Sequence, residues 1–342
     1  MTNPRRARAV ALAALAAIAL LATQGCDVSP AAQASAPAHP DMTFAQARTV
    51  YQSYLTASDA AAANGDSAAG LSLVSDASWE FARARYTVHA SNGTPVQRYV
   101  YGTPRYYVPI VSGFPHWFVV DVPRHTADSG DVDTLMVFGQ SKPEGTWSLD
   151  GEAALQPGQK MPAIATGSGG YAIAMSTYQQ GLLVQPNVTG GTQAAVVDEG
   201  PQASAAGLVA PGPQTTSLYS EQAAARAATP KDLEYLWYML GTPYPVFALQ
   251  TTGGGALVLY GVDLDTVTEH PDATSSTDPA GTPIPIPAAA KPMLATPSEV
   301  AGHVLDVYYT YEFAAIDPPA STKNGQLTII AASRALAYAH AF

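Results

Sequence analysis

Cys26 is the residue of this sequence best placed to take part in chemistry. It is the only cysteine among 342 residues, so a disulfide within the chain cannot form. Its thiol is a nucleophile that is available for covalent modification. It comes shortly after an unbroken apolar run from Ala9 to Ala22. The position of the cysteine, rather than a partner residue, indicates its use.

The residues before Cys26 are typical of an export signal. Three arginines precede the apolar run, which is shorter than the roughly twenty residues that a membrane-spanning helix needs. Gly25-Cys26 resembles a bacterial lipobox, although Thr23 and Gln24 stand where that motif prefers an aliphatic and a small residue. We expect residues 1–25 to be a signal peptide and Cys26 to carry the lipid. The alternative is an ordinary secretory signal with an incidental cysteine.

The histidines do not indicate a catalytic or metal site, and the sequence contains none of the known motifs for such sites. The seven histidines stand at positions 39, 89, 116, 125, 270, 303 and 340, and none is three or four residues from another. His116 lies in a Gly-Phe-Pro-His turn, where a structural role is favoured over a catalytic one. No catalytic residue, metal ligand set or cofactor motif is therefore assigned.

Two other polar groups are weak candidates. Asp121, Asp131 and Asp133 could form a metal cluster, but carboxylates beside an exposed loop are usually solvated. The sequence Gly167-Ser-Gly-Gly170 reads as a glycine turn before a strand and not as a nucleophile elbow. Neither predicts an active site.

Tyrosine is abundant, with 18 residues. The clusters are Tyr99, Tyr101, Tyr106 and Tyr107, and Tyr308, Tyr309 and Tyr311. Packing in half-buried strands explains most of them. The alternative interpretation is that the tyrosines line a ligand-binding concavity, because amphipathic rings suit the open mouth of a curved sheet.

Composition and charge limit the partners. The formal net charge is −11, and loss of the arginine-containing leader would make it more negative. Such a surface repels nucleic acid and anionic lipid headgroups, so we expect no nucleic-acid partner. Membrane contact is expected through the N-terminal lipid, with residues 26–42 as a flexible tether.

The elements expected between residues 43 and 154 are helices followed by strands. Thr43 is a suitable N-cap for a helix that stops at Asn64. Strands are expected at 106–111, 117–122, 134–139 and 145–150, of which the second and third are apolar enough to be central. This order predicts an α+β cone with helices packed on an antiparallel sheet, resembling nuclear-transport-factor-like or cystatin-like folds by analogy.

Residues 161–342 are predicted to form a second, tandem cone-like α+β domain, since the chain is long enough for two cores. The low-complexity stretch 185–217 is expected to be a loop. Asp306–Ile316 alternates as a strand, an Asn-Gly turn follows, and Gln326–His340 is expected to return as an interior strand.

Three phrases carry a family resemblance: Leu208–Leu218, Pro245–Tyr260 and Tyr311–Pro319. In these phrases and their order the chain resembles a family of actinobacterial, Streptomyces-type secreted lipoproteins with a domain of unknown function, over about residues 43–342. The resemblance implies an envelope location and a two-part α+β body. It implies no assigned activity and supplies no catalytic residues.

Three functions are compatible with these observations. The favoured one is a lipid-anchored, non-catalytic protein at the extracytoplasmic face of the cell membrane that binds a small ligand or an envelope protein. The alternatives are an envelope enzyme with its active site in a sheet cavity and a structural or assembly factor without a ligand. An open aromatic mouth would favour binding, a buried carboxylate without partners would favour the enzyme, and a filled cone would favour the assembly factor.

The lipid assignment predicts a specific result for Cys26→Ser. The variant should not incorporate a fatty-acid analogue during metabolic labelling, because the hydroxyl of serine does not replace the thiol that accepts the diacylglyceryl group. It should also be shed or remain uncleaved. Equal labelling of the wild type and the variant would contradict the assignment.

Overall fold

The structure is a computed structural model that describes residues 41–127, 130–241, 244–271 and 282–342. These residues belong to one compact unit, His39–Phe342. The predicted signal peptide at 1–25, the predicted lipid-attachment residue Cys26 and the tether up to residue 40 lie outside the described residues.

Three helices open the described chain: α1 (Phe44–Asn64), α2 (Ser67–Leu71) and α3 (Asp76–Asn92). α1 starts with a capping box, since Thr43 Oγ1 accepts from the Gln46 N–H at 3.2 Å and Gln46 Oε1 accepts from the Thr43 N–H at 2.7 Å. Gly65 ends it in the left-handed conformation, with φ 64. The helix predicted from Thr43 to Asn64 is confirmed.

An antiparallel sheet, the N-terminal sheet, follows these helices. Its strands are β1 (Val100–Tyr101), β2 (Arg105–Tyr107), β3 (His116–His125), β4 (Val132–Gln140) and β5 (Ser148–Ala154). The order is β1-β3-β4-β5, and β2 also pairs with β3. β3 and β4 lie centrally, as their apolar sequences predict.

The second half repeats the succession of helices and antiparallel strands. Its helices are α4 (Thr189–Glu199) and α5 (Thr216–Ala228), with short 3-10 turns η1 (Ser168–Gly170), η2 (Pro186–Val188), η3 (Gly200–Gln202) and η4 (Lys291–Met293). The C-terminal sheet contains β6 (Glu234–Gly241), β7 (Phe247–Gln250), β8 (Ala256–Glu269), β11 (Val304–Asp317) and β12 (Thr328–Ala341). Its order is β12-β11-β8-β6, with β7 also on β8. β9 (Ile284–Pro285) and β10 (Val300–Ala301) pair separately.

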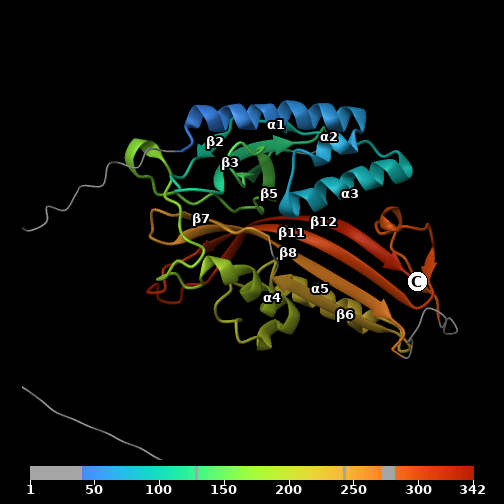
Figure 1. The fold of residues 1–342 in the computed structure, drawn as a ribbon. Coiled ribbons are helices and arrows are strands. Elements are labelled where there is room, and N and C mark those ends of the chain that lie inside the picture. The colour runs from blue at the N-terminus through green and yellow to red at the C-terminus, as the bar shows by residue number, and fades with distance from the viewer. Residues whose placement is uncertain (1–40, 128–129, 242–243, 272–281) are drawn as a thin grey trace, which may run out of the picture. The chain divides into compact units, whose positions relative to one another are not determined.

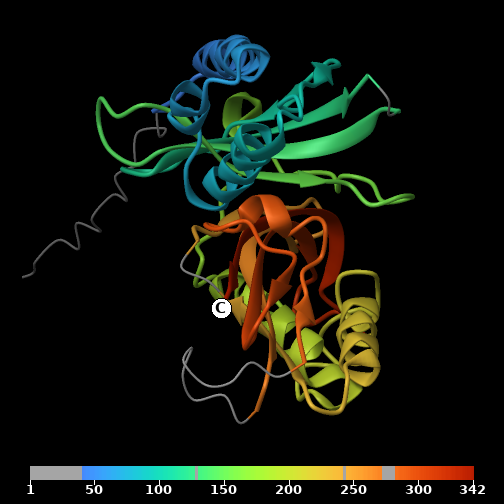
Figure 2. The same ribbon diagram turned by 90° about the vertical axis from the view of Figure 1, so that its right-hand side faces the viewer.

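The two sheets pack face to face between layers of helices (Figure 1). On the outer face of the N-terminal sheet, α1 contributes Tyr51, whose ring centroid lies 6.0 Å from that of Phe138. The inner face shares one hydrophobic cluster with the C-terminal sheet, including Leu135 and Leu257. Figure 2 shows the N-terminal sheet in green above the orange and red strands of the C-terminal sheet. α4 and α5 cover the remaining face of the C-terminal sheet. The predicted α+β class is confirmed.

The predicted boundary between residues 43–154 and 161–342 falls where the chain leaves the N-terminal sheet. Side chains from both sides of this point enter the shared cluster, among them Ala153 and Ala314. Each sheet therefore covers an apolar face of the other. Separation of the two halves would expose both faces to water.

Residues 185–217, predicted to be a loop, contain α4 instead. This helix buries Val196 and Val197 against the C-terminal sheet. Its glycines permit close packing, because a Cβ on Gly190 would lie 3.1 Å from the Val262 side chain and a Cβ on Gly241 would lie 3.1 Å from the backbone of Gly191. The loop prediction is wrong here because composition does not distinguish small residues that allow contact from small residues that confer flexibility.

β11 and β12 form the predicted C-terminal hairpin, and Asn324 in its turn has φ 56. β12 is not an interior strand, because it lies at the edge of the C-terminal sheet. Other elements bind its carbonyls: Gln156 N–H donates to Ile330 O at 2.9 Å, and Arg83 Nη2 donates to Ala337 O at 2.8 Å. Alternation in the sequence defines the two faces of a strand but not its number of neighbours.

Asp317 ends β11 and is fully buried, with 0% exposure. Its carboxyl oxygens accept from the Val184 N–H at 3.3 and 3.4 Å. Burial disfavours the charged form and raises the pKa of Asp317 to about 7, which the hydrogen bond from Val184 offsets only in part. Between about pH 4 and pH 7 the folded protein therefore holds a proton that the unfolded chain releases.

The raised pKa of Asp317 predicts that the free energy of unfolding falls as the pH rises through this range, because the folded state binds more protons than the unfolded state. Asp317→Asn should flatten the fall, and each unit of pKa shift corresponds to about 1.4 kcal/mol. Asp59→Asn is the control: a hydrogen bond from Arg98 lowers the pKa of Asp59, so its contribution is constant above about pH 5. Urea denaturation at about pH 5 and about pH 8 measures the slopes. An unchanged slope in Asp317→Asn would contradict the assignment.

Candidate functional site

Three charged side chains meet in the interior at one end of the N-terminal sheet. Arg124 Nη1 lies 2.7 Å from Glu152 Oε2, and Arg85 Nη1 lies 3.4 Å from Glu152 Oε1. The exposed fraction of the side chain is 26% for Arg85, 9% for Arg124 and 4% for Glu152. We call these three residues the arginine–glutamate cluster.

β3, β5 and α3 position the cluster. Arg124 lies near the end of β3, opposite Tyr101 of β1, and Glu152 lies opposite Met136 of β4. Both strands are antiparallel to β4, and Tyr101 and Met136 belong to the cluster of side chains packed against α1. α3 packs across the end of β5 and brings Arg85 to the same carboxylate. One face of a sheet and one helix therefore bring together residues that are distant in the sequence.

Two buried carboxyl groups beside each other differ in charge. Burial alone would raise the pKa of Glu152, but the positive charges of Arg124 and Arg85 outweigh this effect and lower it. Burial, followed by the negative charge of Glu152, raises the pKa of Glu312 well above its usual range. Glu312 accepts hydrogen bonds from Ser78 Oγ at 2.8 Å and from the Glu152 N–H at 2.7 Å. The raised pKa favours the neutral form of Glu312, so Glu152 is the carboxyl group of the two that faces the arginines in its charged form.

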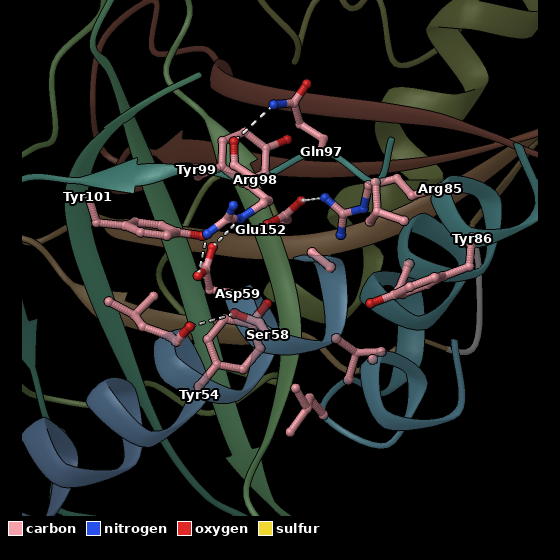
Figure 3. Close-up of a pocket in the computed structure, with 17 residues that line it drawn as sticks. Tyr54, Ser58, Asp59, Arg85, Tyr86, Gln97, Arg98, Tyr99, Tyr101 and Glu152 are labelled. Carbon is pink, nitrogen blue, oxygen red and sulfur yellow. Dashed lines mark hydrogen bonds and ion pairs between the residues drawn. The ribbon is translucent and has the colours of Figure 1, made fainter. Parts of the chain in front are cut away.

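A cavity of about 160 Å³, the smaller hollow, opens beside the cluster between α1, α3 and residues 96–101 (Figure 3). Its polar lining comprises Tyr54, Ser58, Asp59, Arg85, Tyr86, Gln97, Arg98, Tyr99, Tyr101 and Glu152. Arg98 binds both carboxylate oxygens of Asp59, at 2.6 and 2.7 Å. Asp59 therefore neutralises the charge of Arg98 at the surface. Arg85 and Glu152 belong to the buried cluster and also line the cavity.

A second cavity of about 700 Å³, the larger hollow, shares Arg85, Gln97, Tyr99 and Glu152 with the smaller one. It lies between α3, the segment after α3, residues 288–293 and β12. Its volume is in the range of small-molecule sites. The arginine–glutamate cluster therefore contributes side chains to both cavities.

The structure divides the predicted tyrosine clusters. Tyr99 and Tyr101 line the smaller hollow, and the Arg124 guanidinium lies 4.2 Å from the Tyr99 ring centroid. Burial raises the pKa of Tyr101 to about 12, so its hydroxyl remains protonated. Tyr106 packs edge-on against Tyr51, with centroids 5.9 Å apart.

The second tyrosine cluster lies on the C-terminal sheet, away from the lining of both hollows. Tyr309 and Tyr311 belong to the core beneath α4 and α5, while Tyr308 stacks on Tyr338 with centroids 4.6 Å apart. Packing therefore explains the second tyrosine cluster. Of the two predicted clusters, only the first contributes side chains to the two hollows.

The predicted polar candidates do not form a single site. Asp121 and Asp133 lie near each other, since burial, followed by the negative charge of Asp133, raises the pKa of Asp121. His116 Nε2 lies 3.5 Å from Asp41, and its ring stacks on Phe114. Asp131 pairs with His125 at 2.7 Å, whereas Asp121 is buried and lies 4.0 Å from Arg105. Within the described ranges, no group of three or more His, Cys, Asp or Glu side chains could hold a metal ion.

Arg85, Arg124 and Glu152 were not identified from the sequence. Arg124 stands near the end of a strand that is mostly apolar, two residues after Val122, and Glu152 stands within a short strand. Only 13% of the residues in this chain are charged, so an arginine within a mostly apolar strand is unusual. This arginine is the feature of the sequence that could have indicated the site. Such a residue has to be paired if it is buried.

The fold and the site define an α+β protein with a charged, tyrosine-lined cavity. By sequence the chain belongs to the family described as Domain of unknown function (DUF8094), whose model matches residues 38–340. The expected domain of unknown function is thereby confirmed. No curated protein matches the chain, and no solved structure matches it. In the part of the chain that the structure describes, no helix is both long and apolar enough to cross a membrane.

Removal of the Glu152 carboxylate should destabilise the fold strongly. Glu152→Ala leaves Arg124 buried without its counter-ion, which typically costs about 3–5 kcal/mol. Asp59→Ala also removes the partner of an arginine, but at an exposed pair, where water and salt screen the interaction and the loss should be small. Urea denaturation compares the two variants. A loss in Glu152→Ala no larger than that in Asp59→Ala would contradict a structural role for the cluster.

Proposed function

We propose that this chain is a lipid-anchored protein of the extracytoplasmic face of the cell membrane that binds a small organic ligand in the larger hollow without transforming it. The location is supported by the basic and apolar leader, by Cys26 directly after it and by the resemblance to actinobacterial lipoproteins. The lipid would be its contact with the membrane.

The observation that carries the binding function is the cavity of about 700 Å³ beside a buried charged cluster. Ligand sites are typically concave and mainly apolar, with a few polar groups that fix orientation. The larger hollow has this composition: Arg85, Arg124 and Tyr99 are near Glu152, and apolar side chains make up most of the remaining lining. A cavity of this size also disfavours the filled cone expected of an assembly factor.

The pairing of the cluster favours binding over catalysis. The enzyme alternative calls for a buried carboxylate that is free to accept or donate a proton. Glu152, the carboxylate that lines both hollows, is held in its charged form by Arg124 and Arg85. A carboxylate with a lowered pKa and two counter-ions is a weak base, so it is better suited to orienting groups than to proton transfer.

The proposal predicts that a small molecule co-purifies with the full-length protein. Detergent extraction followed by native mass spectrometry should detect it on the wild type. Ala289→Trp, a change on the exposed rim of the larger hollow, should displace it, whereas Ala60→Trp on the exposed face of α1 should not. A wild type without bound molecule, or equal occupancy in both variants, would contradict binding in this cavity.

A further inference from the structure

Arg85 has hydrogen-bonding capacity that its neighbours do not use. A guanidinium group carries five N–H donors. Within the described residues, the hydrogen bond of the Arg85 side chain is the 3.4 Å contact from Nη1 to Glu152 Oε1. Arg124 differs, because it pairs with Glu152 at 2.7 Å and packs on the Tyr99 ring. With 26% of its side chain exposed, Arg85 can offer donors to a ligand in the larger hollow.

The charge balance of the cluster favours an anion at Arg85. Glu152 compensates one of the two guanidinium groups, and burial next to Glu152 disfavours a second negative charge on Glu312, which leaves an excess of positive charge at Arg85 and Arg124. It stands out in a chain whose net charge is −11. In a partly buried site, hydrogen bonds from a guanidinium to a carboxylate are shorter and stronger than neutral ones, and they are frequently bidentate.

An apolar surface continues from Arg85 along the same helix. Phe81, Ala84 and Val88 recur at three- and four-residue spacing on α3 and line the larger hollow together with Arg85. The apolar residues of the other walls are Pro95, Ala288, Ala289, Pro292, Met293, Ala335 and Leu336. A ligand that places an acidic group at Arg85 would therefore place the rest of its length against apolar side chains.

We propose that the ligand of the larger hollow is an amphiphilic carboxylate, whose head group binds the Arg85 guanidinium and whose apolar tail lies between α3 and residues 288–293. This inference rests on the proposed binding function and adds the chemical class of the ligand. Arg124 is a positioning residue in this arrangement, because it fixes the carboxylate of Glu152 and leaves Arg85 to the ligand.

Three probes that differ only in the head group test the inference: 4-phenylbutyrate, 4-phenylbutanol and 4-phenylbutylamine. Calorimetric titration uses the full-length protein in lipid nanodiscs, with empty nanodiscs as the reference. We expect the carboxylate to bind at least about tenfold more tightly than the alcohol and the amine, because its hydrogen bonds with the guanidinium are charge-assisted. Arg85→Met should abolish this preference, and Arg85→Lys should retain part of it.

Arg83→Met is the matched control, because Arg83 stands on the same helix but does not line either hollow. The probe series on the wild type needs no variant, so the test holds even if Arg85→Met is poorly folded. Equal affinity for the three head groups, or an unchanged preference in a folded Arg85→Met, would overturn the inference. If none of the probes binds while a molecule co-purifies in the larger hollow, the ligand class is wrong and the binding function stands. If neither is found, both fail.

Discussion

The position of Glu152 is the constraint on which the rest of the structure depends. Its backbone N–H donates to Glu312 Oε2 at 2.7 Å, which links β5 of the N-terminal sheet to β11 of the C-terminal sheet. Its side chain lies on the outer face of the N-terminal sheet and pairs with Arg124 and Arg85. One residue therefore joins the two sheets through its backbone and anchors the charged cluster through its carboxylate. Polar groups at this depth are tolerated because every one of these contacts is a charged or hydrogen-bonded pair.

The helices on the outer face of the N-terminal sheet explain why the arginine–glutamate cluster can be buried. Tyr101 and Met136, the strand neighbours of Arg124 and Glu152, pack in the hydrophobic cluster that includes α1, and α3 contacts both β5 and β12. An exposed edge strand would weaken this arrangement, but both edges of the C-terminal sheet are occupied. At β6, Asp198 accepts from the Met239 N–H at 2.8 Å and Arg226 donates to Tyr235 O at 3.0 Å. These contacts cover two of the backbone groups that would otherwise be open to a further strand.

The candidate site arises where the two halves meet. α3 and the segment after it supply one side of the larger hollow, while residues 288–293 and β12 supply the other. Neither half contains the full lining. A ligand in this cavity would therefore contact elements from both sheets, and its binding depends on the same packing that holds the sheets together. The two proposals on function thus follow from one feature of the fold: a paired charge cluster at the border of a large cavity.

The sequence by itself determined the local features, because they depend on neighbours along the chain. Thr43 caps α1, the apolar runs of β3 and β4 indicate central strands, and Asn324-Gly325 closes the last hairpin. The α+β class follows from the order of these elements. One of the predicted tyrosine clusters also reaches a cavity, through Tyr99 and Tyr101.

Only the tertiary structure decided the remaining features, since each depends on residues distant in the sequence. The sequence predicts a loop where α4 lies, because the small residues of this segment also suit a flexible loop. Their structural reason, the close fit of Gly190 against Val262, is a contact between separate elements that the sequence does not show. The edge position of β12 depends on which strands pair, which alternation does not specify. Arg85 and Glu152 are 67 positions apart, and a charged residue shows its burial only when its partner is known. The sequence therefore determined the elements, and long-range packing decided which of their side chains form the site.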